Sequence, residues 1–276
     1  MRAFAMNAVR RLAVVAALAS LGSCSKTPVA AKLVLTGAST LAPLAADIGR
    51  RLEAERPGVR IDVQTGGTSR GIHDVRQGLA DIGLVSRALK DDEKDLVAFP
   101  IARDGIGVIL HASNPVPHLT DAQVAAIFTG QVAHWKSLGG RDAPITVVHK
   151  AEGRSTLELF CRYYGLRNAD IKAHVVIGDN AQGIKTVAGN PDSIGYVSLG
   201  SAEHEAGRGT AIKLLAVGDV PATTANVANG TFPLSRPLNL VVPKAPEGLA
   251  KEFIDYARSE KVHDLIRRHG FVPVAR

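Results

Sequence analysis

The chain has 276 residues, 46% of them hydrophobic, and carries 33 Lys and Arg against 26 Asp and Glu, which gives a formal net charge of +7. Aromatic residues make up only 4% of the chain and form no stripe with basic residues, so the composition argues against a nucleic-acid-binding protein. The nine His show no metal-ligand spacing and the two Cys form no pair, so we expect neither a metal site nor a cofactor.

The N-terminus has the pattern of an export signal. Residues 1–23 begin with basic residues and continue into an apolar stretch, 12–21, that is too short to span a bilayer comfortably. The segment leads into Leu-Gly-Ser-Cys, which resembles the bacterial lipobox, where the Cys is acylated. We therefore expect a lipoprotein signal peptide over 1–23, a lipid on Cys24 and a short tether over 24–31. An ordinary signal peptide, with Cys24 at this place by chance, is the alternative.

Strands and helices alternate from residue 32 onward. Apolar runs and period-two alternation predict strands at 32–36, 60–65, 81–86, 104–110, 144–149, 193–199 and 238–243. Apolar residues at helical spacing predict helices at 39–55, 68–80, 119–130, 180–191, from 155 onward, and in two pieces over 248–270. This alternation is typical of an α/β fold with largely parallel sheets, and the length suits two domains. No Pro- or Ser-rich linker separates the domains, so we expect the chain to cross between them through strands.

Hydroxyl-bearing residues follow several strands at the point where a helix begins. The segment TGASTLAPL, 36–44, places Ser39 and Thr40 at a helix start, and TGGTSRG, 65–71, places Thr68 after two glycines. In open α/β sheets ligands bind outside the carboxyl ends of the strands, and helix N-termini at that edge attract anions. Glycines let backbone N–H groups approach such an anion, and hydroxyls add further donors.

A third junction adds positive charge. The segment VVHKAEGRSTLELF, 147–160, holds Lys150 and Arg154 in the loop before Ser155 and Thr156, which open a predicted helix. Two cations and two hydroxyls therefore surround a helix N-terminus, which already carries a partial positive charge. Such a place is attractive only to an anion.

A fourth strand ends in Ser86, which is followed by Arg87. One junction of this kind is explained by ordinary helix caps and turns. Several junctions together with three cations predict an oxyanion pocket, because Arg presents a fork of donors that matches a tetrahedral anion. No loop matches a P-loop or a dinucleotide-binding motif, which disfavours a nucleotide.

An enzyme is the alternative explanation of these junctions. The segment GASTL, 37–41, resembles the G-x-S-x-G nucleophile elbow, but Leu41 stands where the closing Gly is needed. No Asp and His follow in an order that suggests a triad, and no paired carboxylates suggest acid–base chemistry. We therefore expect no enzymatic activity and keep a phosphatase as the alternative.

A succession of segments resembles one family from about residue 32 to 275. They are GASTLAPL, GGTSRGIHDVRQGLADIGLVSR, IARDGIGVILHASNPVPHLT, IFTGQVAHWKSLGG, SIGYVSL and FPLSRPLNLVV. In this order they resemble the phosphate-binding proteins of PstS type that serve ABC transporters and belong to the type II periplasmic binding-protein superfamily. The resemblance implies two α/β lobes around a ligand cleft, with lobe 1 formed by 32–106 plus 237–276 and lobe 2 by 107–236.

The resemblance also implies a set of ligand-binding residues, in which Leu41 acts through its backbone N–H. The set comprises Ser39, Thr40, Leu41, Thr68, Ser86, Arg87, Lys150, Arg154, Ser155 and Thr156. Ser86 stands where the best-known members have a carboxylate, and Lys150 stands where they have an Arg. A carboxylate accepts a hydrogen bond from protonated phosphate, whereas sulfate has no hydrogen to donate, so the choice between these anions stays open.

The sequence therefore predicts an exported, lipid-anchored and monomeric receptor on the periplasmic side of a bacterial membrane. Its expected ligand is inorganic phosphate or a similar oxyanion. Its expected partners are the permease subunits of an ABC importer and the membrane that holds the lipid, with no nucleic acid. The alternatives are the same fold with sulfate, molybdate or a small organic anion as ligand, and an anion sensor without a transporter.

Overall fold

The computed structural model describes residues 31–274. The predicted signal peptide, nearly all of the tether and the expected lipid site at Cys24 lie outside the described residues. None of the helices within the described part of the chain has the length and hydropathy needed to cross a bilayer.

Strands and helices alternate over most of this range, as the sequence predicts. The strands are β1 (Ala31–Gly37), β2 (Val59–Thr65), β3 (Ile82–Val85), β4 (Val97–His111), β5 (Thr146–Lys150), β6 (Val175–Ile177), β7 (Ser193–Ser198), β8 (Ile212–Leu214), β9 (Ser235–Val242) and β10 (Val272–Pro273). The α-helices are α1 (Ala42–Glu55), α2 (Thr68–Arg76), α3 (Asp121–Phe128), α4 (Ser155–Tyr163), α5 (Asn180–Ala188), α6 (Leu199–Gly207), α7 (Thr224–Ala228), α8 (Gly248–Ala257) and α9 (His263–Arg268). A short 3-10 helix, η1 (Asp91–Glu93), follows β3.

The long predicted elements are found near their predicted bounds, whereas several short ones are additional. β4 runs for 15 residues, although the sequence predicts only its second half. Pro100 lies at a register shift within this strand, a position where proline's missing N–H is tolerated. β6 and β8 have 3 residues each, which is too short to show a hydrophobic period.

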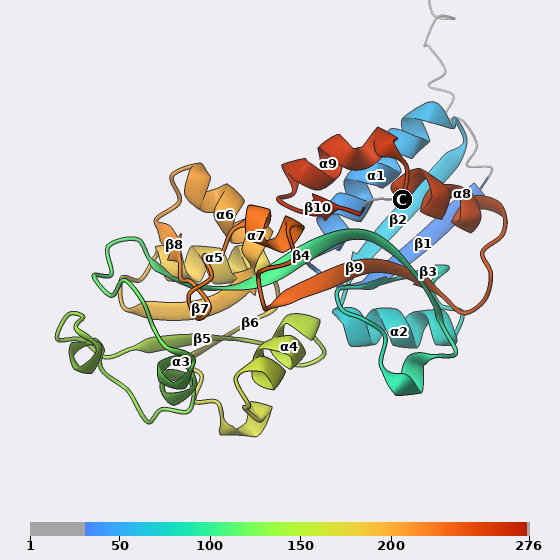
Figure 1. Cartoon of the computed structure of the whole chain (residues 1–276). Helices are drawn as coiled ribbons and strands as arrows, with labels where there is room; N and C mark the ends of the chain where they lie inside the picture. Colours follow the sequence, from blue (N-terminus) through green and yellow to red (C-terminus); the bar gives the residue numbers. More distant parts are fainter. Residues whose placement is uncertain (1–30, 275–276) are drawn as a thin grey trace, which may run out of the picture.

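The strands of residues 31–274 join in one sheet with the order β2-β1-β3-β9-β4-β7-β5-β6. The outer pairs are parallel, as expected for an α/β fold. The centre differs, because β4 and β9 run antiparallel to each other and to their outer neighbours β7 and β3. Figure 1 shows β4 and β9 side by side across the middle of the molecule, with α1, α2 and α8 on one side and α3, α5 and α6 on the other.

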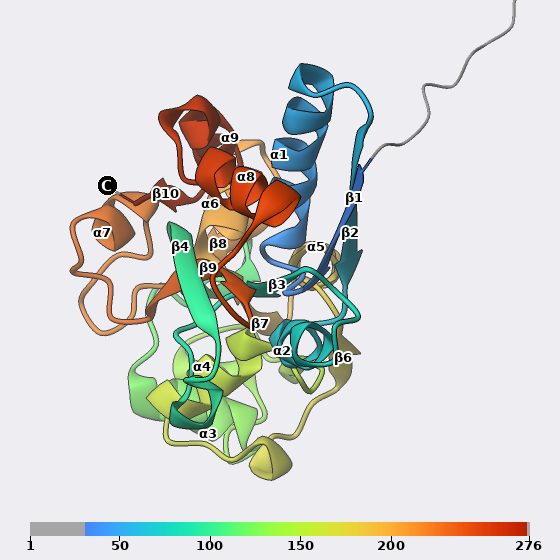
Figure 2. The same cartoon turned by 90° about the vertical axis from the view of Figure 1, so that its right-hand side faces the viewer.

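Two large clusters of buried apolar side chains lie on either side of this central pair. The first core includes Leu35 of β1 and Phe253 of α8, and the second core includes Phe160 of α4. β4 supplies Ile101 to the first core and Ile106 to the second, so this strand passes from one core to the other. Figure 2 shows the corresponding helices apart, with α1, α8 and α9 at one end of the molecule and α3 and α4 at the other.

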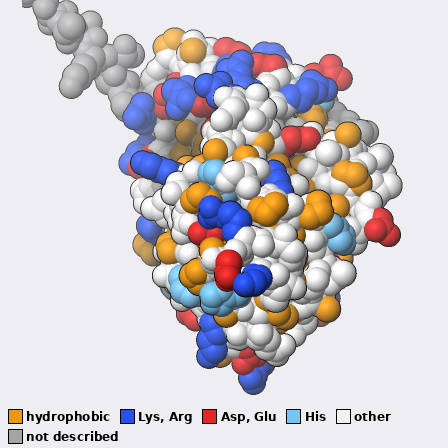
Figure 3. All heavy atoms as spheres, turned by 90° about the vertical axis from the view of Figure 1, so that its left-hand side faces the viewer, with side chains coloured by type: hydrophobic (Ala, Val, Ile, Leu, Met, Phe, Trp, Pro, Cys, Tyr) orange, Lys and Arg blue, Asp and Glu red, His pale blue; other side chains and the backbone are white. Residues whose placement is uncertain are grey.

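The surface on the side of β5 and β8 is mixed in character. Figure 3 shows basic and acidic side chains on this face, interspersed with small apolar spots. Scattered apolar atoms of this kind are normal on a surface that faces water and do not by themselves indicate a docking site.

The C-terminal segment meets α6 through a close contact of two glycines. A Cβ atom added to Gly200 would lie 1.8 Å from the carbonyl oxygen of Gly270, so only a hydrogen fits there. Gly270 follows α9, whose Leu265 packs in the first core, whereas Gly200 lies in α6, whose Leu199 packs in the second. The contact therefore joins elements of the two cores.

We predict that Gly200→Ala lowers the free energy of unfolding by about 1–3 kcal/mol, the usual cost of overpacking, because the methyl group must displace the backbone at Gly270. Gly207→Ala is the matched control, since Gly207 lies in the same helix and nothing lies within 4 Å of its added Cβ. Urea unfolding followed by circular dichroism measures both variants. Equal stability of the two would contradict this account of the contact.

Candidate functional site

The hydroxyls of Thr68, Ser86 and Ser155 meet, although the three residues come from separate elements. Thr68 opens α2, Ser86 follows β3 and Ser155 opens α4. Oγ of Ser155 lies 2.7 Å from Oγ1 of Thr68 and 2.7 Å from Oγ of Ser86, and all three side chains are buried. Three hydroxyls hold three hydrogens, and two of these lie in the contacts between them, so one O–H is left to donate to a ligand.

Arg236 of β9 links the starts of two helices. Its Nη1 donates to Oγ1 of Thr156 at 2.9 Å, and its Nη2 donates to Oγ1 of Thr40 at 3.4 Å. Its Nε and Nη2 also lie 3.2 and 2.8 Å from Oδ2 of Asp104, which balances its charge. Both charged side chains are almost completely buried, so the position of Arg236 is fixed by a desolvated ion pair with further hydrogen bonds.

Lys150, at the end of β5, is the second cation of this group. Its Nζ donates to Oδ1 of Asn180 at 3.0 Å, and the Nδ2 of Asn180 donates to Oγ1 of Thr40 at 3.1 Å. Burial lowers the pKa of Lys150 to about 7, and the positive charges of Arg236 and Arg154 add to this effect. A nearby anion would therefore favour the charged form of Lys150.

Arg154, just before α4, is the third cation. Its Nε and Nη1 are buried and find no hydrogen-bond partner among residues 31–274. The side chain packs against Gly67, where an added Cβ would lie 3.0 Å from Cδ of Arg154 and 2.5 Å from the carbonyl oxygen of Gly153. Gly67 also has a φ of +94°, so both its backbone and the space beside it require glycine. Buried guanidinium donors are normally hydrogen-bonded, so these unpaired donors indicate an acceptor that is not part of the described chain.

Four helices begin at or beside these side chains. Thr40 precedes α1, Thr68 opens α2, Ser155 opens α4 and Asn180 opens α5. The first N–H groups of a helix have no partner within it, and the helix dipole adds partial positive charge at the same end. The site therefore combines side-chain cations, hydroxyls and helix N-termini, which is the chemistry that binds an anion.

Most of the residues expected from the sequence come together here. They are Thr40, Thr68, Ser86, Lys150, Arg154, Ser155 and Thr156. Ser39 lies beside them and lines the neighbouring cavity. The backbone N–H of Leu41 instead donates to the carbonyl of Ala38 at 3.0 Å, in the turn that leads into α1.

Arg87 differs from the expectation because its donors have carboxylate partners. Its Nη1 and Nη2 donate to the carboxylate of Glu93 at 2.6 and 2.7 Å, and its Nε donates to Glu158 at 3.1 Å. The guanidinium is thus engaged within the protein, and we do not count it among the residues that face a ligand.

Sequence reasoning missed Arg236, Asp104 and Asn180. Asp104 is the first residue of the predicted strand 104–110, and Arg236 lies two residues before the predicted strand 238–243. The structure extends both strands past these residues, and charged residues buried within a sheet need a partner. That requirement is the signal that could have found them. Asn180 opens a predicted helix after Asp179, which caps it, and nothing local distinguishes Asn180 from an ordinary first-turn residue.

A cavity of about 890 Å³ adjoins the site beside Thr40 and Asn180. Residues of α1 and the segment after α9 line one side, and residues of α5 and α6 line the other. Thr40 and Asn180 therefore belong both to the cavity wall and to the group of donors.

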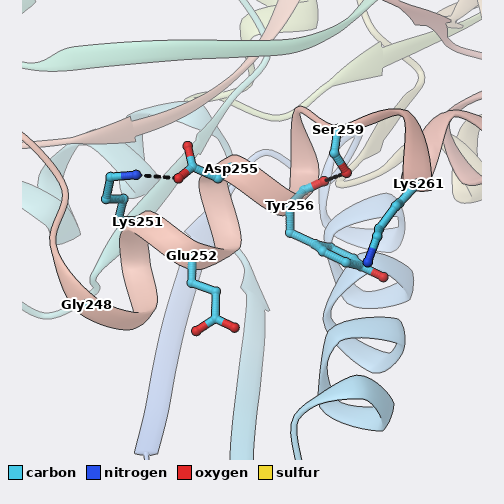
Figure 4. Close-up of a pocket in the computed structure, with 7 residues that line it drawn as sticks. All are labelled: Gly248, Lys251, Glu252, Asp255, Tyr256, Ser259 and Lys261. Carbon is cyan, nitrogen blue, oxygen red and sulfur yellow. Dashed lines mark hydrogen bonds and ion pairs between the residues drawn. The ribbon is translucent and has the colours of Figure 1, made fainter.

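A shallower pocket lies on α8, away from the expected residues (Figure 4). Its polar groups have partners within the protein: Lys251 pairs with Asp255, Glu252 pairs with Arg56, and the Ser259 hydroxyl donates to the carbonyl of Tyr256 at 2.7 Å. Lys261 lies over the ring of Tyr256, with Nζ 5.5 Å from its centre. These internal pairings make the pocket a weaker candidate than the buried site.

The chain matches the family model described as a PBP superfamily domain over residues 23–261. It is 28% identical over 248 residues to the phosphate-binding protein PstS of Bacillus subtilis. The aligned region covers 88% of this chain and 80% of that protein. A Clostridium perfringens protein of 31% identity, solved with bound phosphate, superimposes with a TM-score of 0.81 over 88% of this chain and 100% of that one. The ABC-type phosphate transport receptor of Vibrio cholerae is 28% identical to this chain and superimposes with a TM-score of 0.73. The superposition covers 88% of this chain and 100% of that one.

These similarities confirm two expectations. The structural neighbours have the type II periplasmic binding-protein fold, so the predicted fold class is confirmed. They are binding proteins of transporters and not enzymes, which confirms the expectation of a non-enzymatic chain.

Lys150 gives the ligand-free protein a measurable pH dependence. Its pKa of about 7 lies below the ordinary value of 10.5, so between these values the unfolded chain holds a proton that the folded chain has lost. Stability must therefore rise with pH in this window. We predict that the free energy of unfolding of the wild type, minus that of Lys150→Met, increases by about 2 kcal/mol from pH 7 to pH 9. Urea titrations of both proteins at each pH measure this difference. A difference that stays constant over this range would show that Lys150 has an ordinary pKa.

Proposed function

Because the chain belongs to the PBP superfamily, we propose that it is a binding protein that captures inorganic phosphate for an ABC importer. One observation carries the proposal: within residues 31–274, two buried guanidinium nitrogens of Arg154 have no acceptor. Buried donors without a partner are costly, and a tetrahedral oxyanion supplies several acceptors at once. The relatives named as phosphate-binding proteins support phosphate as that anion.

The charge of the site suits phosphate. Lys150, Arg154 and Arg236 lie close enough for the two guanidinium charges to lower the pKa of Lys150. Asp104 balances one of these cations, so positive charge remains in excess at the converging helix starts. Phosphate is multiply charged near neutral pH, and its oxygens accept from hydroxyls, ammonium and guanidinium groups alike.

The proposed ligand contacts combine the expected residues that meet in the site with two that the sequence did not indicate. They are the side chains of Thr40, Thr68, Ser86, Lys150, Arg154, Ser155 and Thr156, together with Asn180 and Arg236. Ser39 stands at the cavity side of this group.

We assign the two lobes as the sequence suggests, with lobe 1 formed by 32–106 plus 237–276 and lobe 2 by 107–236. The separate cores and the two shared strands β4 and β9 support this division. The described conformation corresponds to the closed state, because buried contacts such as Thr68–Ser155 join the lobes. The lobes then separate by a hinge at β4 and β9 to admit the anion and close over it.

Export and anchoring belong to the same proposal. The N-terminal signal pattern and the lipobox-like residues before Cys24 support an exported lipoprotein held at the periplasmic side of a bacterial membrane. The closed form is then the one that docks on the permease subunits of the importer.

Sulfate or a related oxyanion is the second candidate ligand. The observation that favours it is Ser86, whose hydroxyl lies in the site where a carboxylate would repel a fully ionised anion. A hydroxyl donates to sulfate as readily as it accepts from protonated phosphate. The fold and the closing motion stay the same for this candidate.

Calorimetric titration tests the ligand. The purified protein is stripped of bound anion by unfolding and refolding, and phosphate and sulfate are titrated separately at pH 6 and pH 8. Heat with phosphate alone supports the phosphate receptor, and equal heats support the second candidate. The absence of heat with both anions would contradict the anion site.

We predict that Arg154→Met weakens phosphate binding by about 10- to 100-fold, the scale of lost hydrogen bonds to a charged group. Arg141→Met is the matched control, because Arg141 is half exposed and pairs with Asp192 at the surface of the same lobe. The control should bind phosphate with unchanged affinity in the same calorimetric assay. Unchanged affinity in Arg154→Met would remove Arg154 from the site.

A further inference from the structure

One carboxylate of lobe 2 is contacted by two cations of lobe 1. Oε2 of Glu158, on α4, lies 3.1 Å from Nε of Arg87 and 2.9 Å from Nζ of Lys90. Arg87 and Lys90 both lie in the segment between β3 and η1. These contacts are separate from the group of residues that we propose to hold the anion.

The lobe 1 side of this contact is fixed without Glu158. Glu93 holds the guanidinium of Arg87 through two hydrogen bonds, and its Oε2 also accepts from the backbone N–H of Lys90 at 2.8 Å. Asn239 of β9 donates to the carbonyl oxygen of Arg87 at 2.7 Å. Glu93 therefore holds the guanidinium of Arg87 and the backbone of Lys90, and Nε of Arg87 and Nζ of Lys90 point to the other lobe.

The lobe 2 side is coupled to the anion site through one turn of helix. Glu158 follows Ser155 by three residues, so both lie on the same face of the first turn of α4. The Ser155 hydroxyl meets Thr68 and Ser86 of lobe 1 at 2.7 Å. Any motion of α4 that brings Ser155 to these hydroxyls also brings Glu158 to Arg87.

We propose that Glu158, Arg87 and Lys90 form a closure latch that holds the start of α4 over the bound anion and slows its release. Glu158 is a positioning residue in this account, because it acts through α4 and does not touch the ligand. The inference rests on the proposed function, since a latch has a role only if the lobes close on an anion.

Burial gives the latch more strength than a surface ion pair. The side chain of Arg87 is 3% exposed and that of Glu158 is 21% exposed, so water screens their contact only partly. Lys90 is 42% exposed and adds a weaker, more screened contribution. Burial alone lowers the pKa of Arg87, but the hydrogen bond and charges of Glu93 and Glu158 raise it above its ordinary value, so the guanidinium stays charged.

The latch is also reversible. When the lobes separate, Arg87 keeps its bonds to Glu93 and is not left as an unpaired buried charge. The carboxylate of Glu158 and the ammonium group of Lys90 become hydrated when their contact breaks. A cavity of about 390 Å³, lined by Arg87, Lys90 and Arg162 among others, lies beside the contact and gives solvent ions access to it. Release should therefore speed up with ionic strength.

The experiment measures the release of radiolabelled phosphate after a chase with unlabelled phosphate, using the full-length protein. Glu158→Gln should raise the dissociation rate roughly three- to tenfold, with the association rate little changed, because only the closed state loses an interaction. Added salt should also speed release less in this variant than in the wild type. Lys90→Met should act in the same direction, and its effect should be smaller in the Glu158→Gln background.

Asp91→Asn is the matched control, because Asp91 carries the same charge on the adjacent segment and its exposed carboxylate pairs with Lys94. It should release phosphate at the wild-type rate. Wild-type release rates in Glu158→Gln and in Lys90→Met would overturn the latch, even if both variants unfold more easily. A wild-type protein that binds no phosphate would overturn the proposed function as well, so the two failures are distinguishable.

Discussion

The buried ion pair between Asp104 and Arg236 is the interaction on which the rest of the site depends. The two residues stand directly opposite each other on β4 and β9, the antiparallel pair that runs through the middle of the sheet. Asp104 also accepts from the Ser198 hydroxyl at 3.0 Å, and Arg236 donates to Thr40 and Thr156. One ion pair therefore ties the two central strands to the starts of α1 and α4 and fixes the distance between the two halves of the site.

The proposed anion site contains repulsions between buried cations that a bound anion would relieve. Arg154 and Arg236 lie near Lys150, and their charges together with burial lower the pKa of Lys150. Four helix starts add partial positive charge at the same place. In the described conformation the fold already brings these donors together around one place, and a bound anion would relieve the repulsion between the cations.

Local sequence signals predicted the hydroxyls and cations at the strand–helix junctions, because glycines, caps and basic residues all fall within a few positions of Thr68 or Ser155. They did not show that Arg87 is engaged, since Glu93 lies six residues further on, in a segment where no helix or strand is predicted, and Glu158 lies 71 residues further along the chain. Arg236 was missed for a related reason: its partner Asp104 is 132 residues away, and both residues lie at or just before the start of a predicted strand. The parallel outer strands followed from the alternation of elements, whereas the antiparallel central pair depends on long-range pairing.

The most direct test of this account is anomalous diffraction from crystals grown with arsenate, which has the shape and charge of phosphate. The account predicts one strong arsenic peak enclosed between the lobes, with oxygens within hydrogen-bond distance of Arg154, Lys150 and the Ser155 hydroxyl. A peak beside Arg87, or one confined to the cavity of about 890 Å³ without contact to Arg154, would contradict it.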